Sequence, residues 1–407
     1  MQTTSDPWGP HRDRAFHALR QGQMAEAGSL FSELVTTGSR DPQDHFGLAM
    51  VRYNQRQWED CRQALLSACR LESGFVHAWL YLGVVEEQRG RHRSAAGAYL
   101  RADRLVSGAD PSNLPADVKQ LLGRGARYLG EELFAALAEE LAAVARDHSS
   151  PAVARIADGV EMFCGRTPVR YAHPRWRPGL FYVPDLQPRP FFERQDFPWV
   201  AELESCTSII REELIAGLSS MQGFEPYVQY AKDSPQAQIW GGLNGSFSWS
   251  TLHLARHGQT VVEACARFPR TFTAIKDVPD LHDVRGYGPE IMFSLLHPKT
   301  LIPAHRGSVN GRLVAHLPLI VPPNCGYLRA ADEKREWVEG QLMVFDDTFD
   351  HEAWNGSDER RIVLIFDVWN PQLSLPEREA FRRVLDRSAR FERELLAESI
   401  FDEEAPL

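Results

Sequence analysis

The chain lacks the marks of a secreted or membrane protein. Its six cysteines are scattered and none stands in a CxxC pair, which excludes a zinc ribbon or a disulfide frame and favours a reducing compartment. No apolar window is long enough to span a bilayer, and residues 1–10 carry neither a basic start nor an apolar run. We therefore expect a cytoplasmic protein with no signal peptide and no membrane partner.

An excess of basic residues is also missing. The chain has 45 lysines and arginines against 55 aspartates and glutamates, and its isoelectric point is near 5.8. Because a nucleic-acid surface needs clustered positive charge, we predict no nucleic-acid partner. The 43% hydrophobic and 25% charged residues over 407 positions are typical of a globular protein with more than one domain. The sequence leaves the oligomeric state open.

The first third of the chain repeats itself. Small and bulky residues recur at intervals of 34 positions, which is the tetratricopeptide period. The three columns are Ala15, Ala49 and Gly83; Ala27, Cys61 and Ala95; and Phe31, Leu65 and Tyr99. We predict a tetratricopeptide-like helical domain over residues 1–147, in which residues 115–147 form one further helical pair. The alternative is a plain helical bundle with a chance register.

Two changes of texture follow the repeats. Residues 148–198 are rich in proline, which precludes long helices and predicts an ordered, extended connector. Residues 199–407 contain short segments with period-two alternation, for which we predict a double-stranded β-helix (jelly roll) and an α+β multidomain chain overall. The expected elements are a helix over 197–218, strands over 310–321, 336–345 and 361–369, and a terminal helix over 376–396 after a capping box at Ser374 and Glu377.

Two histidines in this domain are candidate metal ligands. His305 and His351 each end a predicted strand beside a turn, and in a double-stranded β-helix such strand ends return to the same mouth. Neutral imidazoles there are good ligands for a redox metal. The usual non-haem iron site adds a carboxylate two residues after the first histidine, but this chain has Gly307. Taken alone, two histidines in a β-domain are more often polar surface residues.

A nearby arginine points to a dicarboxylate co-substrate. Arg361 begins an alternating strand, so an inward guanidinium would form a forked pair with the distal carboxylate of 2-oxoglutarate. Ser294 would donate a second hydrogen bond to that carboxylate. His316 shares strand parity with Arg312 and Val314, so all three would face one side of the sheet. The alternative for Arg361 is a surface arginine beside Arg360.

Several linked motifs give the region from Phe293 to Pro371 a specific resemblance. They are His305-Arg-Gly, Asn310-Gly-Arg312, Phe345-Asp-Asp347, His351-Glu-Ala-Trp354 and Phe366-Asp-Val-Trp-Asn-Pro371. In sequence and spacing this region resembles the aspartyl/asparaginyl β-hydroxylase family of iron(II)/2-oxoglutarate dioxygenases. The repeat region in front is similar to that of the animal members.

The resemblance implies roles for individual residues. It implies Fe(II) held by His305 and His351 alone, with Asp347 as a catalytic residue near the metal that holds a water. The three residues implied to bind 2-oxoglutarate are Ser294, His316 and Arg361. Arg312 is implied to bind the substrate, an Asp- or Asn-like residue in a peptide or protein, and O2 is the oxidant. Val314 departs from the animal members, which have an arginine there.

Two other functions stay open at the sequence level. The space beside Gly307 would hold chloride on iron in a related halogenase. Alternatively, the helical repeats dock a peptide while the β-domain is catalytically idle, although an idle site has no need for converging imidazoles and an arginine. The substrate is also open among a protein domain, a biosynthetic peptide, an amino acid and a lipid. We expect Trp337, Trp354 and Trp369 to be core residues and His297 to lie in a turn.

Overall fold

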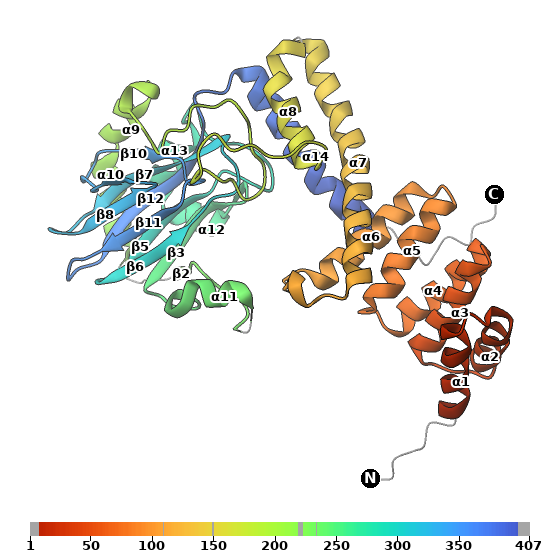
Figure 1. The fold of residues 1–407 in the computed structure, drawn as a ribbon. Coiled ribbons are helices and arrows are strands. Elements are labelled where there is room, and N and C mark those ends of the chain that lie inside the picture. The colour runs from red at the N-terminus through yellow and green to blue at the C-terminus, as the bar shows by residue number, and fades with distance from the viewer. Residues whose placement is uncertain (1–7, 109, 149, 219–222, 233, 398–407) are drawn as a thin grey trace, which may run out of the picture. The chain divides into compact units, whose positions relative to one another are not determined.

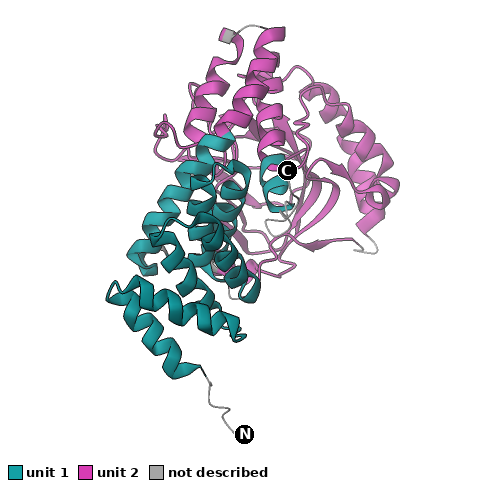
Figure 2. Cartoon of the chain, turned by 90° about the vertical axis from the view of Figure 1, so that its right-hand side faces the viewer, with its two compact units in different colours: residues 1–133, 390–407 teal, residues 134–389 magenta. Residues whose placement is uncertain are grey.

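The structure is a computed structural model that describes residues 8–108, 110–148, 150–218, 223–232 and 234–397. The chain divides into two compact units, residues 1–133 with 390–407 (unit 1) and residues 134–389 (unit 2), coloured separately in Figure 2. The division falls within a helix, α7 (Ala116–Asp147), and so before the boundary expected at residue 147. In the described part of the chain, no helix combines the length and the apolar character needed to cross a bilayer.

Unit 1 is built from helical hairpins, shown in red to orange in Figure 1. The helices are α1 (Gly9–Arg20), α2 (Met24–Thr36), α3 (Pro42–Asn54), α4 (Trp58–Leu71), α5 (Val76–Gln88) and α6 (His92–Val106). The alanines, Cys61 and the bulky residues of the three 34-residue columns are buried, and Gly83 is buried with them. A Cβ on Gly83 would stand 2.6 Å from the Tyr99 ring, so the small residue is required for helix packing. The predicted tetratricopeptide-like unit is confirmed.

The prediction of a helical pair at residues 115–147 is wrong, because α7 is one uninterrupted helix of 32 residues. The segment contains glycines but no proline after Pro115, and glycine in a helix costs only about 1 kcal/mol. Gly125 is needed for packing instead of a turn, since a Cβ there would stand 2.7 Å from the Tyr99 ring.

Unit 2 contains two antiparallel sheets. The strands are β1 (Phe191–Phe192), β2 (Glu225–Pro226), β3 (Trp249–Arg256), β4 (Gln259–Thr260), β5 (Ile291–Leu296), β6 (Thr300–His305), β7 (Arg312–Ile320), β8 (Gly326–Ala330), β9 (Glu333–Arg335), β10 (Met343–Phe345), β11 (His351–Asn355) and β12 (Arg361–Trp369). The larger sheet has the order β1-β10-β7-β12-β5-β3-β2, with β4 paired to β3, and the smaller has the order β6-β11-β8-β9. Two antiparallel sheets in this domain agree with the predicted jelly-roll class.

Alternation along the central strands gives the larger sheet two different faces. On β5, β7 and β12, one set of side chains, such as Phe293, Leu317 and Phe366, is fully buried in a hydrophobic core. That core includes residues of four helices, and Figure 1 shows these helices beside the sheet. They are α9 (Val200–Ser205), α10 (Thr207–Leu218), α12 (Val262–Arg267) and α13 (Pro269–Lys276). The opposite set on the same strands is therefore free to build a pocket.

Three further helices lie outside the sheets of unit 2, and the last of them continues beyond residue 389 into unit 1. They are α8 (Ala154–Phe163), α11 (Pro235–Trp240) and α14 (Leu375–Ala397). The terminal helix was predicted within one residue at each end. Of the predicted capping box, the structure shows the glutamate side, in which Ser374 N and Oγ both donate to Glu377 Oε2 at 2.8 Å. The single helix expected over 197–218 is instead α9 and α10.

The strand expected over 336–345 is shorter than predicted. Only β10 (Met343–Phe345) pairs there, and residues 336–342 connect it to β9 without strand geometry. Alternation alone overestimated the strand because the indole of Trp337 turns inward from irregular backbone, where its side chain is 4% exposed.

Residues 172–192, here called the strap, belong to the packed interior of unit 2. Trp176, Phe181 and Val183 are fully buried. Trp176 bridges to Phe349 and Phe181 to Val309, and β1 at the end of the strap pairs with β10. This proline-rich segment forms little regular structure and is laid between the loops of the β-domain. The extended connector expected over residues 148–198 also contains the helix α8.

Candidate active site

The two candidate metal ligands lie side by side on the smaller sheet. His305 ends β6 and His351 begins β11, and the two residues are direct partners in the strand pairing. Their ring centroids are 4.0 Å apart. The sequence prediction that both strand ends reach one mouth is therefore met by the backbone register.

Both imidazoles have one nitrogen fixed by the backbone. His305 Nδ1 lies 2.8 Å from Pro303 O, and His351 Nδ1 lies 3.1 Å from Phe349 O. A carbonyl only accepts, so each Nδ1 carries the proton and each Nε2 keeps its lone pair. Burial lowers the pKa of His305 to about 3 and that of His351 to about 4, so both rings are neutral near pH 7. These are the tautomer and charge state that bind a metal through Nε2.

The place beside Gly307 is filled by a carboxylate from another loop. A Cβ at position 307 would overlap Asp347, and Gly307 N donates to Asp347 O at 2.7 Å. Asp347 Oδ1 is buried and has no hydrogen-bond partner among the described residues. The glycine therefore makes room for the Asp347 carboxylate, which occupies the space that a side chain at 307 would need. In the part of the chain that the structure describes, no three His, Cys, Asp or Glu side chains form a metal-binding group.

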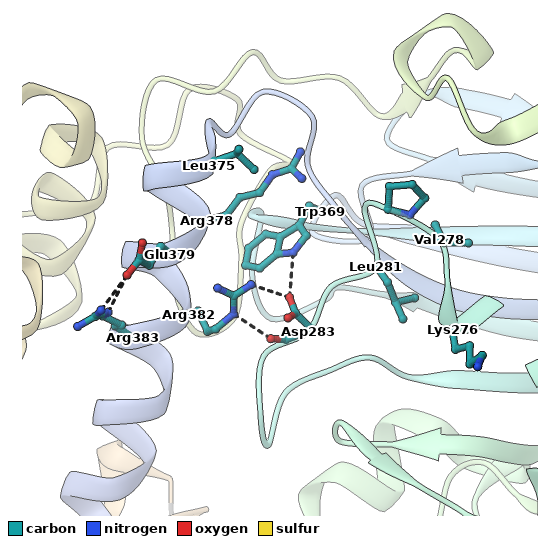
Figure 3. Close-up of a pocket in the computed structure, with 11 residues that line it drawn as sticks. Lys276, Val278, Leu281, Asp283, Trp369, Leu375, Arg378, Glu379, Arg382 and Arg383 are labelled. Carbon is teal, nitrogen blue, oxygen red and sulfur yellow. Dashed lines mark hydrogen bonds and ion pairs between the residues drawn. The ribbon is translucent and has the colours of Figure 1, made fainter. Parts of the chain in front are cut away.

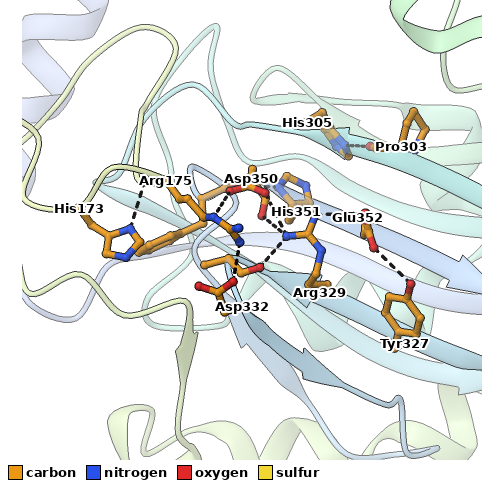
Figure 4. A network of polar contacts seen from close by, with 12 residues as sticks. His173, Arg175, Pro303, His305, Tyr327, Arg329, Asp332, Asp350, His351 and Glu352 are labelled. Carbon is orange, nitrogen blue, oxygen red and sulfur yellow. Dashed lines mark hydrogen bonds and ion pairs between the residues drawn. The ribbon is translucent and has the colours of Figure 1, made fainter.

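Charged side chains brace the strand that carries His351 (Figure 4). Asp350 and Glu352 flank the histidine, and Arg329 on β8 bonds to Asp350 Oδ2 and Glu352 Oε2 at 3.0 Å each. From the strap, Arg175 pairs with Asp332 at 2.8 Å and accepts from Asp350 N through its carbonyl at 3.3 Å. The start of β11 is thus held from two sides.

The strap also fixes the loop that carries Asp347. Trp176 Nε1 donates to Asp346 Oδ2 at 2.8 Å, and the indole stacks on Phe349 with centroids 5.8 Å apart. Gly179 N donates to Gly307 O at 3.0 Å. The strap therefore contacts both the loop that carries Asp347 and the loop that follows His305.

An unpaired arginine lies on the larger sheet across the pocket. Arg361 is 1% exposed, and neither its Nε nor its Nη1 has a hydrogen-bond partner in the described structure. Burial lowers its pKa to about 10, so the guanidinium is still charged at pH 7. Trp337 covers it, with the guanidinium carbon 4.6 Å from the ring centroid. A buried, charged and largely unbonded guanidinium is costly unless an anion completes it.

Two further donors lie in the same pocket. Trp337 Nε1 donates to His316 Nδ1 at 3.3 Å, so the His316 proton is on Nε2. Trp249 Nε1 donates to Ser294 Oγ at 3.2 Å, which leaves the Ser294 hydroxyl proton free to be donated. Burial and Arg361 hold the pKa of His316 well below its usual range, so it is a neutral donor.

Arg312 is already paired on both sides. It donates to Asp367 Oδ1 at 2.7 Å and forms a second, short ion pair with Asp347. Although burial works against it, the two carboxylates raise the pKa of Arg312 above its usual value. Burial raises the pKa of Asp367 to about 6. Arg312 therefore acts first as a bridge between two acids.

Aromatic side chains form the outer wall of the pocket. Trp240 from α11 lies 5.0 Å from the His305 ring and 5.8 Å from Trp249, and Tyr227 lies 4.2 Å from Trp249, all between centroids. The pocket has a volume of about 320 Å³, at the small end for ligand sites. It therefore suits a small co-substrate together with one side chain of a larger substrate.

A larger hollow of about 690 Å³ lies elsewhere on unit 2, beside α14 (Figure 3). Two of its arginines are paired within the lining, since Arg382 donates to Asp283 at 2.7 Å and Arg383 to Glu379 at 2.8 Å. Its described lining contains no histidine or cysteine. The smaller pocket is the candidate active site.

All seven site residues predicted from the sequence line this pocket. They are Ser294, His305, Arg312, His316, Asp347, His351 and Arg361. The lining residues that the prediction missed include Tyr227, Trp240, Glu290 and Arg306. Glu290 lies one residue before β5 and has the same parity as Ser294, which was a usable signal for one of them. Tyr227 follows the short strand β2 and Trp240 ends the short helix α11, so neither lies on a long element with a period to follow.

Comparison with known proteins finds a family similarity for the region that contains this pocket. Residues 204–371 match the family described as aspartyl/asparaginyl beta-hydroxylase. In sequence, this region is similar to the aspartyl/asparaginyl β-hydroxylase family. The chain is 30% identical over 209 residues to the human aspartyl/asparaginyl beta-hydroxylase, covering 50% of this chain and 26% of that protein.

Another relative of the hydroxylase domain carries a different name. The ornithine lipid ester-linked acyl 2-hydroxylase of Rhizobium tropici is 33% identical over 184 residues, covering 45% of this chain and 61% of that protein. The chain thus spans about a quarter of the length of the human protein and about three-fifths of the length of the Rhizobium tropici protein. Among solved structures, a Pseudomonas putida prolyl-4-hydroxylase is 19% identical with a TM-score of 0.25, covering 44% of this chain and 93% of that one.

Proposed function

We propose that the protein is an Fe(II)- and 2-oxoglutarate-dependent hydroxylase that acts on the β-carbon of an Asp- or Asn-type residue in a peptide or protein. The observation that carries this proposal is the pairing of two neutral imidazoles, His305 and His351, opposite a buried arginine without a hydrogen-bond partner for Nε or Nη1. A structural role explains neither feature, since an unpaired buried charge lowers stability.

The residues fit both absent groups. His305 and His351 present Nε2 lone pairs and would hold the iron. Arg361 and Ser294 would hold the distal carboxylate of 2-oxoglutarate, and His316 would donate from Nε2 to its other end. The missing arginine at Val314 leaves His316 as the single described donor at that end.

Iron(II) with 2-oxoglutarate and O2, when bound, supplies the oxidising power that hydroxylates an unactivated carbon. The chain contributes position and exclusion of water. Arg361 fixes the co-substrate by charge, and Trp337 and Trp249 set the hydrogen-bonding state of His316 and Ser294. Asp347 Oδ1 would accept a hydrogen bond from a water in the pocket. The aromatic side chains of Tyr227, Trp240 and Trp249 limit the entry of further solvent.

The halogenase alternative is disfavoured by the filled space at Gly307. Because the Asp347 carboxylate occupies that place, a chloride beside it would face a like charge at short range. The idle-domain alternative is disfavoured by Arg361, whose burial is useful only when an anion binds. A product assay with and without chloride separates hydroxylation from chlorination.

The helical unit favours a peptide substrate. Regular hairpins present a concave face that suits an extended or helical chain, so we assign peptide recruitment to unit 1. We also propose a cytoplasmic location, which the six free cysteines favour.

The test is metal binding and 2-oxoglutarate turnover in single variants. His305→Ala and His351→Ala should each abolish iron-dependent turnover while circular dichroism stays that of the wild type, because the strands persist without the imidazole. His297→Ala, in the turn between β5 and β6, is the matched control and should leave both iron affinity and turnover unchanged. Unchanged anaerobic iron affinity in both ligand variants would sink the assignment.

A further inference from the structure

The charged residues that line the pocket leave one cation unexplained. Three are acidic and three are basic: Glu290, Asp347, Asp367, Arg306, Arg312 and Arg361. Arg312 forms ion pairs with both Asp347 and Asp367. Glu290 lies 3.3 Å from His253 and 3.0 Å from His257. Among the described residues this pairing leaves two cations over, Arg306 and the buried Arg361.

The two unpaired arginines lie at different depths. Arg361 is buried on the larger sheet, where the proposed function assigns it to the co-substrate. Arg306 is exposed, directly follows the candidate ligand His305, and lines the same pocket with Ser308 and the aromatic Trp240. Arg306 is therefore the exposed cation among the residues that line this pocket, where a group entering from solvent would meet it.

Arg312 is poorly placed for that task. Its guanidinium is engaged by two carboxylates, and its side chain is 12% exposed. A substrate carboxylate would have to displace one acid while lying beside the other, which places like charges together. Val314, the other pocket-lining position on β7 near it, carries no charge.

We propose that Arg306, instead of Arg312, binds the carboxylate of the substrate and sets the enzyme's preference for an acidic peptide. The inference rests on the proposed function and names its substrate class: a peptide with Asp at the hydroxylated position. A guanidinium meets a carboxylate with two parallel hydrogen bonds, which fixes orientation as well as charge. Because the pocket holds only about 320 Å³, the neighbouring peptide residues lie outside, against the aromatic rim.

The test uses the full chain and peptide pools with random flanks. Four pools have a central Asp, a central Asn, a central Lys, or a central Asn next to a fixed Glu. Enrichment is measured on enzyme loaded with Mn(II) and 2-oxoglutarate, which does not turn over, and oxygen incorporation is measured with Fe(II). The wild type should enrich the Asp pool at least tenfold over the Asn pool, and the Asn–Glu pool should stay near the Asn pool.

Charge reversal gives the sharpest outcome. Arg306→Gln should abolish the preference, and Arg306→Glu should favour the Lys pool, whereas Arg306→Lys should retain a reduced preference without the forked geometry. Arg360→Glu, an equal charge change at an exposed position outside the pocket lining, should leave enrichment as in the wild type. Arg312→Gln should lower turnover but keep the acidic preference.

Several results would overturn the inference. These are equal enrichment of all pools by the wild type, the absence of any enrichment, an acidic preference that persists in Arg306→Glu, or one that is lost in Arg312→Gln and kept in Arg306→Gln. Enrichment of the Asn–Glu pool to the level of the Asp pool would move the carboxylate to a neighbouring residue and also contradict it. Consumption of 2-oxoglutarate is recorded separately, so loss of the proposed chemistry and loss of the charge preference are distinguishable.

Discussion

Arg62 in unit 1 and Arg361 in unit 2 are buried arginines, 3% and 1% exposed, but their surroundings differ. Arg62 Nε donates to Glu86 Oε1 at 2.7 Å, and Glu86 also accepts from Arg89 at 2.9 Å. Arg361 has no bonded partner for Nε or Nη1 in the described structure. Both sites bury charge, so burial alone does not identify function.

The difference shows how to separate structural from functional charge. Buried polar groups in proteins are nearly always satisfied, and an exception needs an explanation. In unit 1 the ion pair is complete, so it serves the packing of the hairpins. In unit 2 the buried arginine lacks hydrogen-bond partners at a place where a bound ligand would supply them. Functional sites are where such exceptions to stable packing are expected.

The largest expected effect is in unit 1. Glu86→Leu leaves Arg62 buried without its main partner and should destabilise unit 1 by about 3–5 kcal/mol. Hydrogen exchange of α3 to α6 measures this without assuming that the two units unfold together. The double variant Arg62→Met/Glu86→Leu should recover most of the loss, and a double variant as unstable as the single one would show that packing, not charge, is responsible.

The corresponding change in unit 2 should have the opposite sign for stability. Arg361→Met removes an uncompensated buried charge and should raise the unfolding temperature of the metal-free protein. Loss of the cation–π contact with Trp337 should offset part of this increase. It should also raise the 2-oxoglutarate requirement ten- to a hundred-fold, since a charged hydrogen bond contributes about 1.5–3 kcal/mol.

Arg360→Met is the matched control for Arg361→Met, because it is exposed and next in sequence. It should leave the 2-oxoglutarate requirement as in the wild type. If Arg360→Met has the large effect and Arg361→Met none, the co-substrate binds to the other arginine.

Neighbouring acids sharpen the comparison inside unit 2. Burial raises the pKa of Asp346 to about 7, although Thr348 and Trp176 donate to it. Between about pH 4 and pH 7 the folded carboxyl keeps a proton that the unfolded one has lost, so this group lowers stability as pH rises through that window. Asp346→Asn lacks this slope, so its stability relative to the wild type should increase with pH, on the order of 1–3 kcal/mol. Unfolding curves at pH 5 and pH 8 measure it, and parallel pH dependence would refute it.

The smallest expected effect comes from Trp337, which contacts two of the residues proposed to bind 2-oxoglutarate. Trp337→Phe removes the donor to His316 and weakens the contact with Arg361, so it should raise the 2-oxoglutarate requirement a few-fold, equivalent to about 0.5–1.5 kcal/mol. Trp369→Phe is the control, because this indole is also buried in unit 2 but lies outside the pocket. Equal effects of the two variants would mean that Trp337 is ordinary core.

The sequence predicted the site better than the path of the chain around it. Parity along β7 and β12 placed His316 and Arg361 correctly because strand alternation has a fixed period of two. The expectation that Trp337 is core was right about burial but missed its contact with Arg361, because residues 336–342 have no regular period. The pairing of Arg312 with Asp347 and Asp367 also escaped the sequence, since it joins positions 35 and 55 residues away.

The strap is synthesised long before the residues against which it packs. Its Trp176 precedes its partner Asp346 by 170 residues. At 5–20 residues per second a ribosome needs roughly 10–30 s to make that stretch, and for this time the buried aromatic side chains of the strap have no docking place. The loop after His305 and the loop that carries Asp347 can therefore pack against the strap only late, when the last strands emerge. A nascent chain halted before residue 346 would expose Trp176 and Phe181 to chaperones or to other chains.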